Sequence, residues 1–271
     1  IFVTLGALLL LTTCLAYASQ DSRSAASQGQ EASDSRAIFV VTNTADAGPG
    51  SLRDAINAAN STPGNDIITF NITPPGPHVI MPLSQLPPLT DPAGVFIDGL
   101  SQPGGATAGA NPPSTAVLLI EINGMAAGPA HGLWVVSSNN HIQGLCINNF
   151  EQDGICVESG AFEPFIANNV IYCCFVGTDL TGTADMGNGR NQASLWAGVY
   201  VGNQPGGTTS QTIIHANLIS GNYAEGVHIE GPKVPGDVFD NHVLANYIGT
   251  DISGTLGIGN DHEGVCLSEG T

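Results

Sequence analysis

A four-residue pattern of hydrophobic positions recurs along the second half of the chain: glycine, an aliphatic residue, any residue, and a second aliphatic residue. It occurs at residues 132–135, 154–157, 198–201, 226–229 and 264–267. Alternation of this kind predicts a short β-strand at each copy. The glycines are 22, 44, 28 and 38 residues apart. A strand that returns at such intervals predicts a β-solenoid, in which each turn covers the next.

A longer repeat lies inside the two widest intervals. Residues 177–183, Gly-Thr-Asp-Leu-Thr-Gly-Thr, return 72 residues later as Gly-Thr-Asp-Ile-Ser-Gly-Thr at residues 249–255. We interpret each copy as a loop inserted into a basal turn. Asp179 and Asp251 hold the same place in the two loops, and two interpretations remain open. Each carboxylate caps its own turn through backbone N–H groups, or the oxygen-rich loops bind Ca²⁺.

Residues 38–75 predict an N-terminal cap on the solenoid. Residues 38–44 and 67–72 have the pattern of strands, and Ser51 followed by Asp54 forms a capping-box signal for a helix between them. The helix carries one apolar stripe, formed by Leu52, Ala55, Ile56 and Ala59. The first turn of a solenoid exposes its core and its strand edges, so a helix here would cover both.

The other boundaries follow from composition. Residues 1–18 are apolar, uncharged and end in Ala-Tyr-Ala, which predicts a signal peptide truncated at its N-terminus. The Ser/Gln/Ala-rich residues 19–37 predict a flexible leader. Residues 76–271 predict the solenoid body, which we expect to continue into further C-terminal parts. The expected location is therefore secreted or on the cell surface, with no membrane insertion after signal cleavage.

Charge narrows the range of partners. Five Lys and Arg against 23 Asp and Glu give a formal net charge of −18. Such a surface repels nucleic acid and anionic lipid, and we expect neither as a partner. It also repels polyuronates unless a divalent cation bridges the two.

Two segments resemble known bacterial proteins. Residues 40–44 (Val-Val-Thr-Asn-Thr) and 48–56 (Gly-Pro-Gly-Ser-Leu-Arg-Asp-Ala-Ile) resemble the CSLREA-type segment of bacterial surface proteins, with Gly50 in place of its cysteine and Asp54 in place of its glutamate. The Gly-Thr-Asp loops resemble those of bacterial right-handed parallel β-helix repeat proteins. The resemblance implies an all-β fold from residue 38 onward, a right-handed parallel β-helix (β-solenoid) with a short N-terminal capping helix. It implies no single function, because that fold carries lyases, hydrolases, epimerases and adhesins.

If each turn lays down one strand, equivalent residues lie about 4.8 Å apart in columns. Third positions of the pattern then face outward, namely Trp134, Cys156, Tyr200, His228 and Cys266. Trp134, Tyr200 and His228 are the candidate ligand-binding residues of this face, because aromatic rings can stack on sugars. The alternative is that aromatic residues are simply favoured on an exposed β-surface.

Residues preceding the glycines form a second column, namely His131, Asp153, Ala197, Glu225 and Glu263. Glu225 and Glu263 would be adjacent carboxylates, and with Asp153 they are the candidate catalytic residues. Close like charges raise one pKa or recruit a cation. Solvated carboxylates at strand corners are the plainer interpretation.

Three further features complete the sequence predictions. Ile142, Ile166, Ile214 and Phe239 open apolar stretches that we expect to share a second strand register. Asn149, Asn222 and Asn246 precede aromatic residues and are expected to form one asparagine ladder beside an aromatic stack of Phe150, Phe175, Tyr223 and Tyr247. Most cysteines are expected to be buried small residues, and Cys146 with Cys173 or Cys174 is the best candidate disulfide.

Several catalytic motifs are absent from the sequence. There is no Gly-His-Gly, Arg-Ile-Lys or Asp-Asp, which polygalacturonase-like β-helices would carry, and no Gly-x-Ser-x-Gly. We therefore expect glycan binding or surface display, without catalysis in this segment. The alternatives are a carbohydrate-active enzyme (a polysaccharide lyase or glycoside hydrolase) and a structural spacer. No organic cofactor is indicated, and Ca²⁺ is the one candidate ion.

Overall fold

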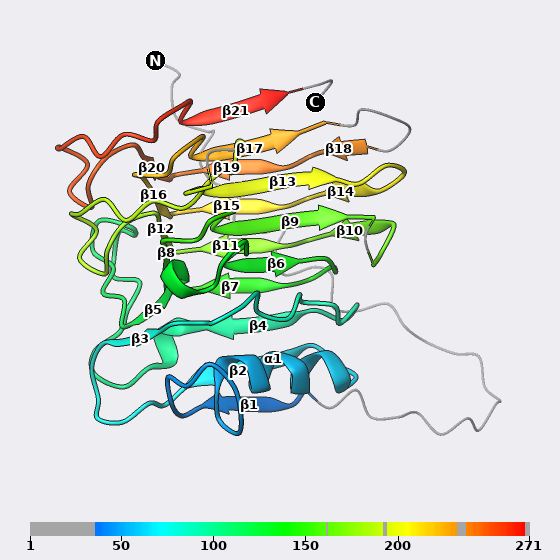
Figure 1. Cartoon of the computed structure of the whole chain (residues 1–271), viewed down its shortest axis with the longest axis vertical. Helices are drawn as coiled ribbons and strands as arrows, with labels where there is room; N and C mark the ends of the chain where they lie inside the picture. Colours follow the sequence, from blue (N-terminus) through cyan, green and yellow to red (C-terminus); the bar gives the residue numbers. More distant parts are fainter. Residues whose placement is uncertain (1–35, 161, 192–193, 232–236, 269–271) are drawn as a thin grey trace, which may run out of the picture. The chain divides into compact units, whose positions relative to one another are not determined.

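The structure is a computed structural model that describes residues 36–160, 162–191, 194–231 and 237–268 (Figure 1). The predicted signal peptide and nearly all of the leader lie outside the described residues. Short strands stack in successive layers from β1 to β21, and one α-helix accompanies the first of them. The structure confirms the predicted fold class, a parallel β-helix with a short N-terminal helix.

The strands form four sheets, and every pairing between neighbouring strands is parallel. Sheet A contains β1 (Ile38–Val41), β2 (Asp66–Phe70), β4 (Val95–Asp98), β7 (His141–Gln143), β11 (Val170–Tyr172), β15 (Ile213–His215) and β19 (His242–Leu244). Sheet B contains β3 (His78–Ile80), β5 (Ile120–Asn123), β8 (Leu145–Asn148), β12 (Phe175–Val176), β16 (Leu218–Ile219) and β20 (Tyr247–Ile248). Sheet C contains β6 (Leu133–Val135), β9 (Ile155–Ser159), β13 (Val199–Asn203), β17 (Val227–Glu230) and β21 (Val265–Ser268). The short sheet D contains β10 (Phe165–Ala167), β14 (Thr208–Ser210) and β18 (Asp237–Phe239).

The glycine-led repeats are the strands of sheet C, as predicted. Val199 pairs with Ile155 on one side and with Val227 on the other, in register. The second and fourth residues of each repeat point into the core, where Val199 and Val201 are fully buried. In the complete turns the chain then passes through sheets D, A and B before it returns to sheet C.

The second predicted register was wrong, because it combined two sheets. Ile142 and Ile214 lie in sheet A, whereas Ile166 and Phe239 lie in sheet D. Both sheets show the same apolar alternation, so the pattern alone does not separate them. The strand β3 was not predicted, because it is short and lies between prolines.

The α-helix α1 (Leu52–Ser61) begins as predicted. Ser51 is its N-cap, and the Ser51 Oγ accepts a hydrogen bond from the Asp54 amide at 3.2 Å. The predicted apolar stripe is the buried face of the helix. That face joins the same core cluster as Ile68 and Phe70 of β2. The helix therefore shields the core beside the first strands, at the blue end of the stack in Figure 1.

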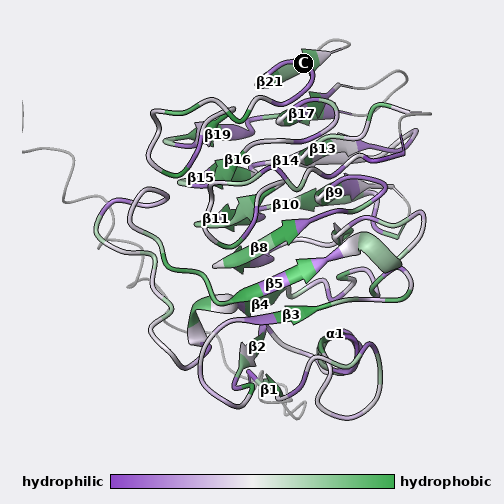
Figure 2. Cartoon of the chain, turned by 60° about the vertical axis from the view of Figure 1, so that its left-hand side comes forward, coloured by the Kyte–Doolittle hydropathy of each residue, from purple (hydrophilic) through white to green (hydrophobic). Residues whose placement is uncertain are grey.

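Sheet B is buried on both faces over β5 and β8. Figure 2 shows both strands largely in green, the colour of hydrophobic residues. The outer face of sheet B carries a second apolar cluster with Cys146 on β8, Phe175 on β12 and Leu218 on β16. Leu180 and Ile252 of the Gly-Thr-Asp loops pack against it. The two loops cover the sheet together, since the Ile252 amide donates to the Gly182 carbonyl at 2.8 Å. The predicted aromatic stack does not form, because Phe175 pairs with Cys146 and Leu218 in the neighbouring layers.

The five cysteines in the described part of the chain are free thiols, and four of them are buried. The predicted bridge from Cys146 is therefore absent, and its Sγ donates to the Thr178 carbonyl at 3.1 Å. Cys173 has a φ of +52°. It occupies the sharp corner between sheets A and B that Ala216 and Ala245 occupy in later turns.

Asparagines tie the turns together, but not in the single ladder that was predicted. Asn222 lies between Asn188 and Asn260, and amide side chains bond in sequence at 3.1 and 2.9 Å. A separate ladder joins Asn217 to Asn246, and a third joins Asn140 to Asn169. Asn149 belongs to none of these, since its amide bonds to the neighbouring Asn148.

Replacement of Asn222 by alanine tests these ladders. The side chain is fully buried and bonds to Asn188, Asn260 and the Val176 carbonyl. Buried groups that lose a partner cost about 1–3 kcal/mol each. We expect Asn222→Ala to lower the free energy of urea unfolding by about 2–5 kcal/mol. The exposed Asn71 is the control, and Asn71→Ala should change that free energy by less than ~0.5 kcal/mol. Equal, small effects of the two substitutions would contradict the account.

Candidate functional site

The Asp residues of the two Gly-Thr-Asp loops bind their own loops. Asp179 Oδ1 accepts the amides of Thr183 and Ala184, both at 3.0 Å. Asp251 Oδ1 does the same with Thr255 and Leu256. Burial acts to raise the pKa of Asp179, but its hydrogen bonds outweigh this and the pKa is lowered. This geometry fits the turn-capping interpretation. Neither residue belongs to a group of three or more possible metal ligands among the described residues.

The outer face of sheet C carries the predicted third-position column. Trp134, Cys156, Tyr200, His228 and Cys266 pair in that order along β6, β9, β13, β17 and β21. Not all of them are exposed, however. Cys156 is buried, although its position in the strand predicted an outward side chain. The face is therefore not one open aromatic strip.

An aromatic cluster covers the early part of this face. Trp134 contacts Phe162 edge-on, with ring centroids 5.7 Å apart. Trp196 meets His131 edge-on at 5.5 Å. Phe162 and Trp196 come from segments between the strands, so the repeat pattern gave no signal for their positions. Trp134 is half-buried as a result.

The column before the glycines also forms, and it brings His131 and Asp153 together. The Gly132 amide donates to the Asp153 carbonyl at 2.9 Å, which fixes the two layers in register. His131 Nδ1 lies 3.1 Å from Asp153 Oδ2. Burial raises the pKa of Asp153, although His131 and the Ala197 amide act in the opposite direction. Asp153 is 1 % exposed, so it does not reach a substrate in solvent.

Glu225 and Glu263 are neighbours in the same column, as predicted. Glu225 is 4 % exposed and its Oε2 has no hydrogen-bond partner within the described residues. Glu263 is exposed, and both lie close to Cys266. His262 Nδ1 is 3.8 Å from Glu225 Oε1 and also lines a wide hollow of about 460 Å³. The two carboxylates face different environments, and only Glu263 is open to solvent.

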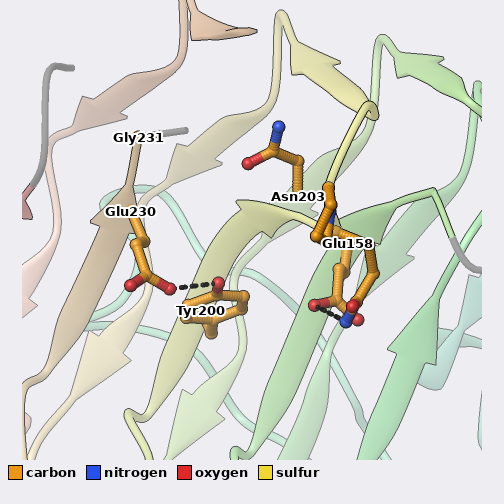
Figure 3. Close-up of a pocket in the computed structure, with 7 residues that line it drawn as sticks. Glu158, Tyr200, Asn203, Glu230 and Gly231 are labelled. Atoms are coloured by element: carbon orange, nitrogen blue, oxygen red, sulfur yellow. Dashed lines mark hydrogen bonds between the residues drawn. The ribbon is translucent and has the colours of Figure 1, made fainter. Parts of the chain in front are cut away.

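A more enclosed pocket of about 240 Å³ lies at the carboxyl ends of β9, β13 and β17 (Figure 3). It is lined by Glu158, Tyr200, Asn203, Gln204, Pro205, Glu230 and Gly231. The Tyr200 hydroxyl donates to Glu230 Oε2 at 2.7 Å, and Gln204 Nε2 donates to Glu158 Oε1 at 2.6 Å. Figure 3 shows the Tyr200 ring between the two glutamates. We call this hollow the Tyr200 pocket.

Gly202 makes room for the Tyr200 ring. On one side Gly202 pairs with Glu158. On the other side the neighbouring strand places Glu230 at the same level, because Val201 pairs with Ile229 and each is followed by the next residue of the column. The column therefore places a glycine between two glutamates. A Cβ on Gly202 would collide with the Tyr200 hydroxyl, so the phenol occupies the space that a side chain would take. Its hydroxyl is then held beside Glu230.

The sequence contained a signal for this site. Glu158, Gly202 and Glu230 each stand four residues after the glycine of their repeat. Among the predicted residues, Tyr200 is the one that the structure places in this pocket. His228 is on the neighbouring strand, where its Nε2 lies 2.8 Å from the Ser268 hydroxyl. Trp134 lies in the aromatic cluster instead.

Burial shifts the pKa of two groups in the pocket, the Glu158 carboxyl and the Tyr200 phenol. Burial raises the pKa of Glu158, against the effect of its bond from Gln204. Burial also raises the pKa of the Tyr200 phenol, and the Glu230 and Glu158 carboxylates raise it further. Tyr200 is therefore a neutral hydrogen-bond donor, and Glu158 keeps its proton to a higher pH than an ordinary glutamate. The pocket thus combines an apolar ring with donors and acceptors.

Comparison with known proteins adds no narrower class. No protein-family model matches the chain, and a search of curated proteins found no match. The structure therefore defines a parallel β-helix protein, and the CSLREA-type resemblance stays a prediction. Within the described ranges no helix has the length and apolar character needed to cross a bilayer.

The environment of Tyr200 can be tested by alkaline titration of the phenols. An ordinary tyrosine ionises near pH 10. We expect one of the five tyrosines to stay protonated above that pH while the protein remains folded. Glu230→Gln removes a negative charge and should lower the pKa of Tyr200, whereas Glu263→Gln at the exposed acid should not. Identical ultraviolet titration curves for the two variants would contradict the assigned contact.

Proposed function

We propose that this chain is an exported β-helix protein that binds a saccharide in the Tyr200 pocket. The observation that carries the proposal is the set of groups around this hollow: one aromatic ring, two carboxylates and two side-chain amides. An apolar surface with a few placed polar groups is typical of small-molecule sites. Export rests on residues 1–18, whose apolar run and Ala-Tyr-Ala ending are typical of a signal peptide.

The charges favour particular sugars. The pocket contains Glu158 and Glu230, and the whole chain has a net charge of −18. Carboxylates accept hydrogen bonds from sugar hydroxyls, and they attract a protonated amine. They repel a uronate, because like charges in a partly buried site are unfavourable. The preferred ligand is therefore a neutral sugar or an amino sugar.

The test is a glycan array, followed by calorimetric titration of the best ligand. We expect binding to neutral or amino-sugar glycans, and no binding to polyuronates without Ca²⁺. Tyr200→Ala should weaken binding about 30-fold, since loss of a central aromatic contact costs about 2 kcal/mol. Gly202→Ala should act similarly by displacing the Tyr200 ring.

Tyr172 provides the matched control. It is half-buried on β11 of sheet A and stacks on His215 at 5.6 Å, away from the pocket lining. Tyr172→Ala should leave the affinity unchanged. Equal loss in Tyr172→Ala and Tyr200→Ala would place the ligand elsewhere. No binding to any glycan would instead favour the spacer role.

A second candidate function is glycoside hydrolysis, favoured by one specific observation. Glu158 and Glu230 lie two strand layers apart, so their backbones are about 9.5 Å apart along the stack, and their side chains lie on either side of Tyr200. Inverting glycosidases hold two carboxyl groups about 6.5–9.5 Å apart. Glu158, with its raised pKa, would be the general acid and Glu230 the base. This pair replaces Glu225 and Glu263 as catalytic candidates, because Glu225 is buried.

Hydrolysis can be separated from binding by one substitution. Glu158→Gln should slow cleavage of the bound glycan by about 10²–10⁴-fold. The affinity of the protein for that glycan should fall by less than tenfold. Product analysis by NMR should show inversion at the anomeric carbon. Binding without any cleavage by the wild type would remove this second function and leave the first intact.

A further inference from the structure

A second cluster of reactive side chains lies in sheet C, outside the Tyr200 pocket. His131 Nδ1, Asp153 Oδ2 and the Cys156 thiol come from two neighbouring turns. One ligand atom from each lies within 4.8 Å of the other two. Asp153 and Cys156 are buried, at 1 % and 2 % exposed. Neither the binding nor the hydrolysis described above uses this cluster.

The spacing within the cluster suits a metal ion. A tetrahedral zinc site with bonds of about 2.0–2.3 Å places its ligand atoms roughly 3.3–3.8 Å apart. His131 Nδ1 and Asp153 Oδ2 are already 3.1 Å apart. The buried His131 Nδ1 makes this close contact without good hydrogen-bond geometry. Small side-chain movements would therefore direct all three groups at one ion.

The surroundings hold these ligands in place. Asp153 Oδ1 accepts the Ala197 amide at 2.6 Å, which leaves Oδ2 facing His131. Trp134 and Trp196 flank the imidazole, with ring centroids 6.0 and 5.5 Å away. Both indole N–H groups are buried without an acceptor among the described residues. A water bound to a metal at this site would give the indole N–H groups a hydrogen-bond acceptor.

The same arrangement occurs a second time in the chain. Asp153-Gly-Ile-Cys156 is matched by Glu263-Gly-Val-Cys266. In each case the third member is the residue before the glycine in the preceding turn. It is His131 for the first copy and Glu225 for the second. The later copy lacks the imidazole, and its Glu263 is exposed. The earlier copy is therefore the better metal site.

We propose that His131, Asp153 and Cys156 bind a Zn²⁺ ion. Zinc is the ion of choice because it accepts nitrogen, oxygen and thiolate ligands in one tetrahedral site. On binding, the Cys156 thiol gives its proton to solvent and the thiolate takes its place on the metal. Three protein ligands leave the fourth position for water. The site links two turns, so zinc also cross-links the stack.

The test uses the full chain, stripped of metal with a chelator. We expect one zinc per chain by calorimetry and elemental analysis. Co²⁺ in place of zinc should produce a thiolate-to-metal charge-transfer band in the near ultraviolet. Cys156→Ser should remove that band and weaken zinc binding at least ~100-fold, because even loss of an outer partner costs 10–100-fold.

Cys266→Ser is the matched control and should keep both the band and the affinity. His131→Gln is the second test variant, because its partly exposed position tolerates the change. Circular dichroism of each metal-free variant establishes that it folds. Three results would overturn the proposal: no zinc bound by the wild type, unchanged binding by Cys156→Ser and His131→Gln, or loss of binding in Cys266→Ser alone. The first would leave His131 and Asp153 as a contact between two side chains without a metal.

Discussion

Parallel, in-register stacking is the constraint on which the rest of this structure depends. Each residue of a turn lies about 4.8 Å from the equivalent residues above and below it, so every position must tolerate its own neighbours in the column. Inside the stack, aliphatic columns such as Ile155, Val199 and Val227 satisfy this by packing. At the corners, columns of asparagine satisfy it, because an amide donates on one side and accepts on the other. Charged residues fit such columns only where an opposite charge, a hydrogen-bond partner or solvent offsets the repulsion between like charges.

That constraint also explains the candidate sites. The column of Glu158, Gly202 and Glu230 keeps two carboxylates two layers apart, and the glycine of the layer between them leaves room for the Tyr200 ring. In the column that precedes the glycines, His131 and Asp153 are direct neighbours, and their closeness creates the group that we propose to hold a cation. The spacing of the acids thus distinguishes the pocket proposed for a neutral ligand from the site proposed for a metal.

Much of the fold could be predicted from the sequence, because several elements repeat a clear pattern. The glycine-led repeats predicted sheet C residue by residue, and Ser51 with the stripe from Leu52 predicted α1. The register containing Ile142 and Ile166 failed because two sheets share one alternation pattern. The Tyr200 pocket was missed, although Glu158 and Glu230 were visible one position beyond the repeat. The aromatic cluster at Trp134 and His131 could not be predicted, because it depends on the paths of the segments carrying Phe162 and Trp196, which no repeat specifies.

A double-mutant cycle on Asn217 and Asn246 tests the stacking most directly. The two are 29 residues apart in sequence, and in the structure the Asn246 side chain accepts bonds from the Asn217 amide groups at 2.8 and 3.0 Å. We predict that alanine at both positions lowers the free energy of urea unfolding by less than the sum of the single changes, with a coupling energy of about 0.5–3 kcal/mol. Asn217 with Asn260, which belong to different ladders, should be additive within ~0.5 kcal/mol. Strict additivity for Asn217 and Asn246 would contradict the stacked arrangement.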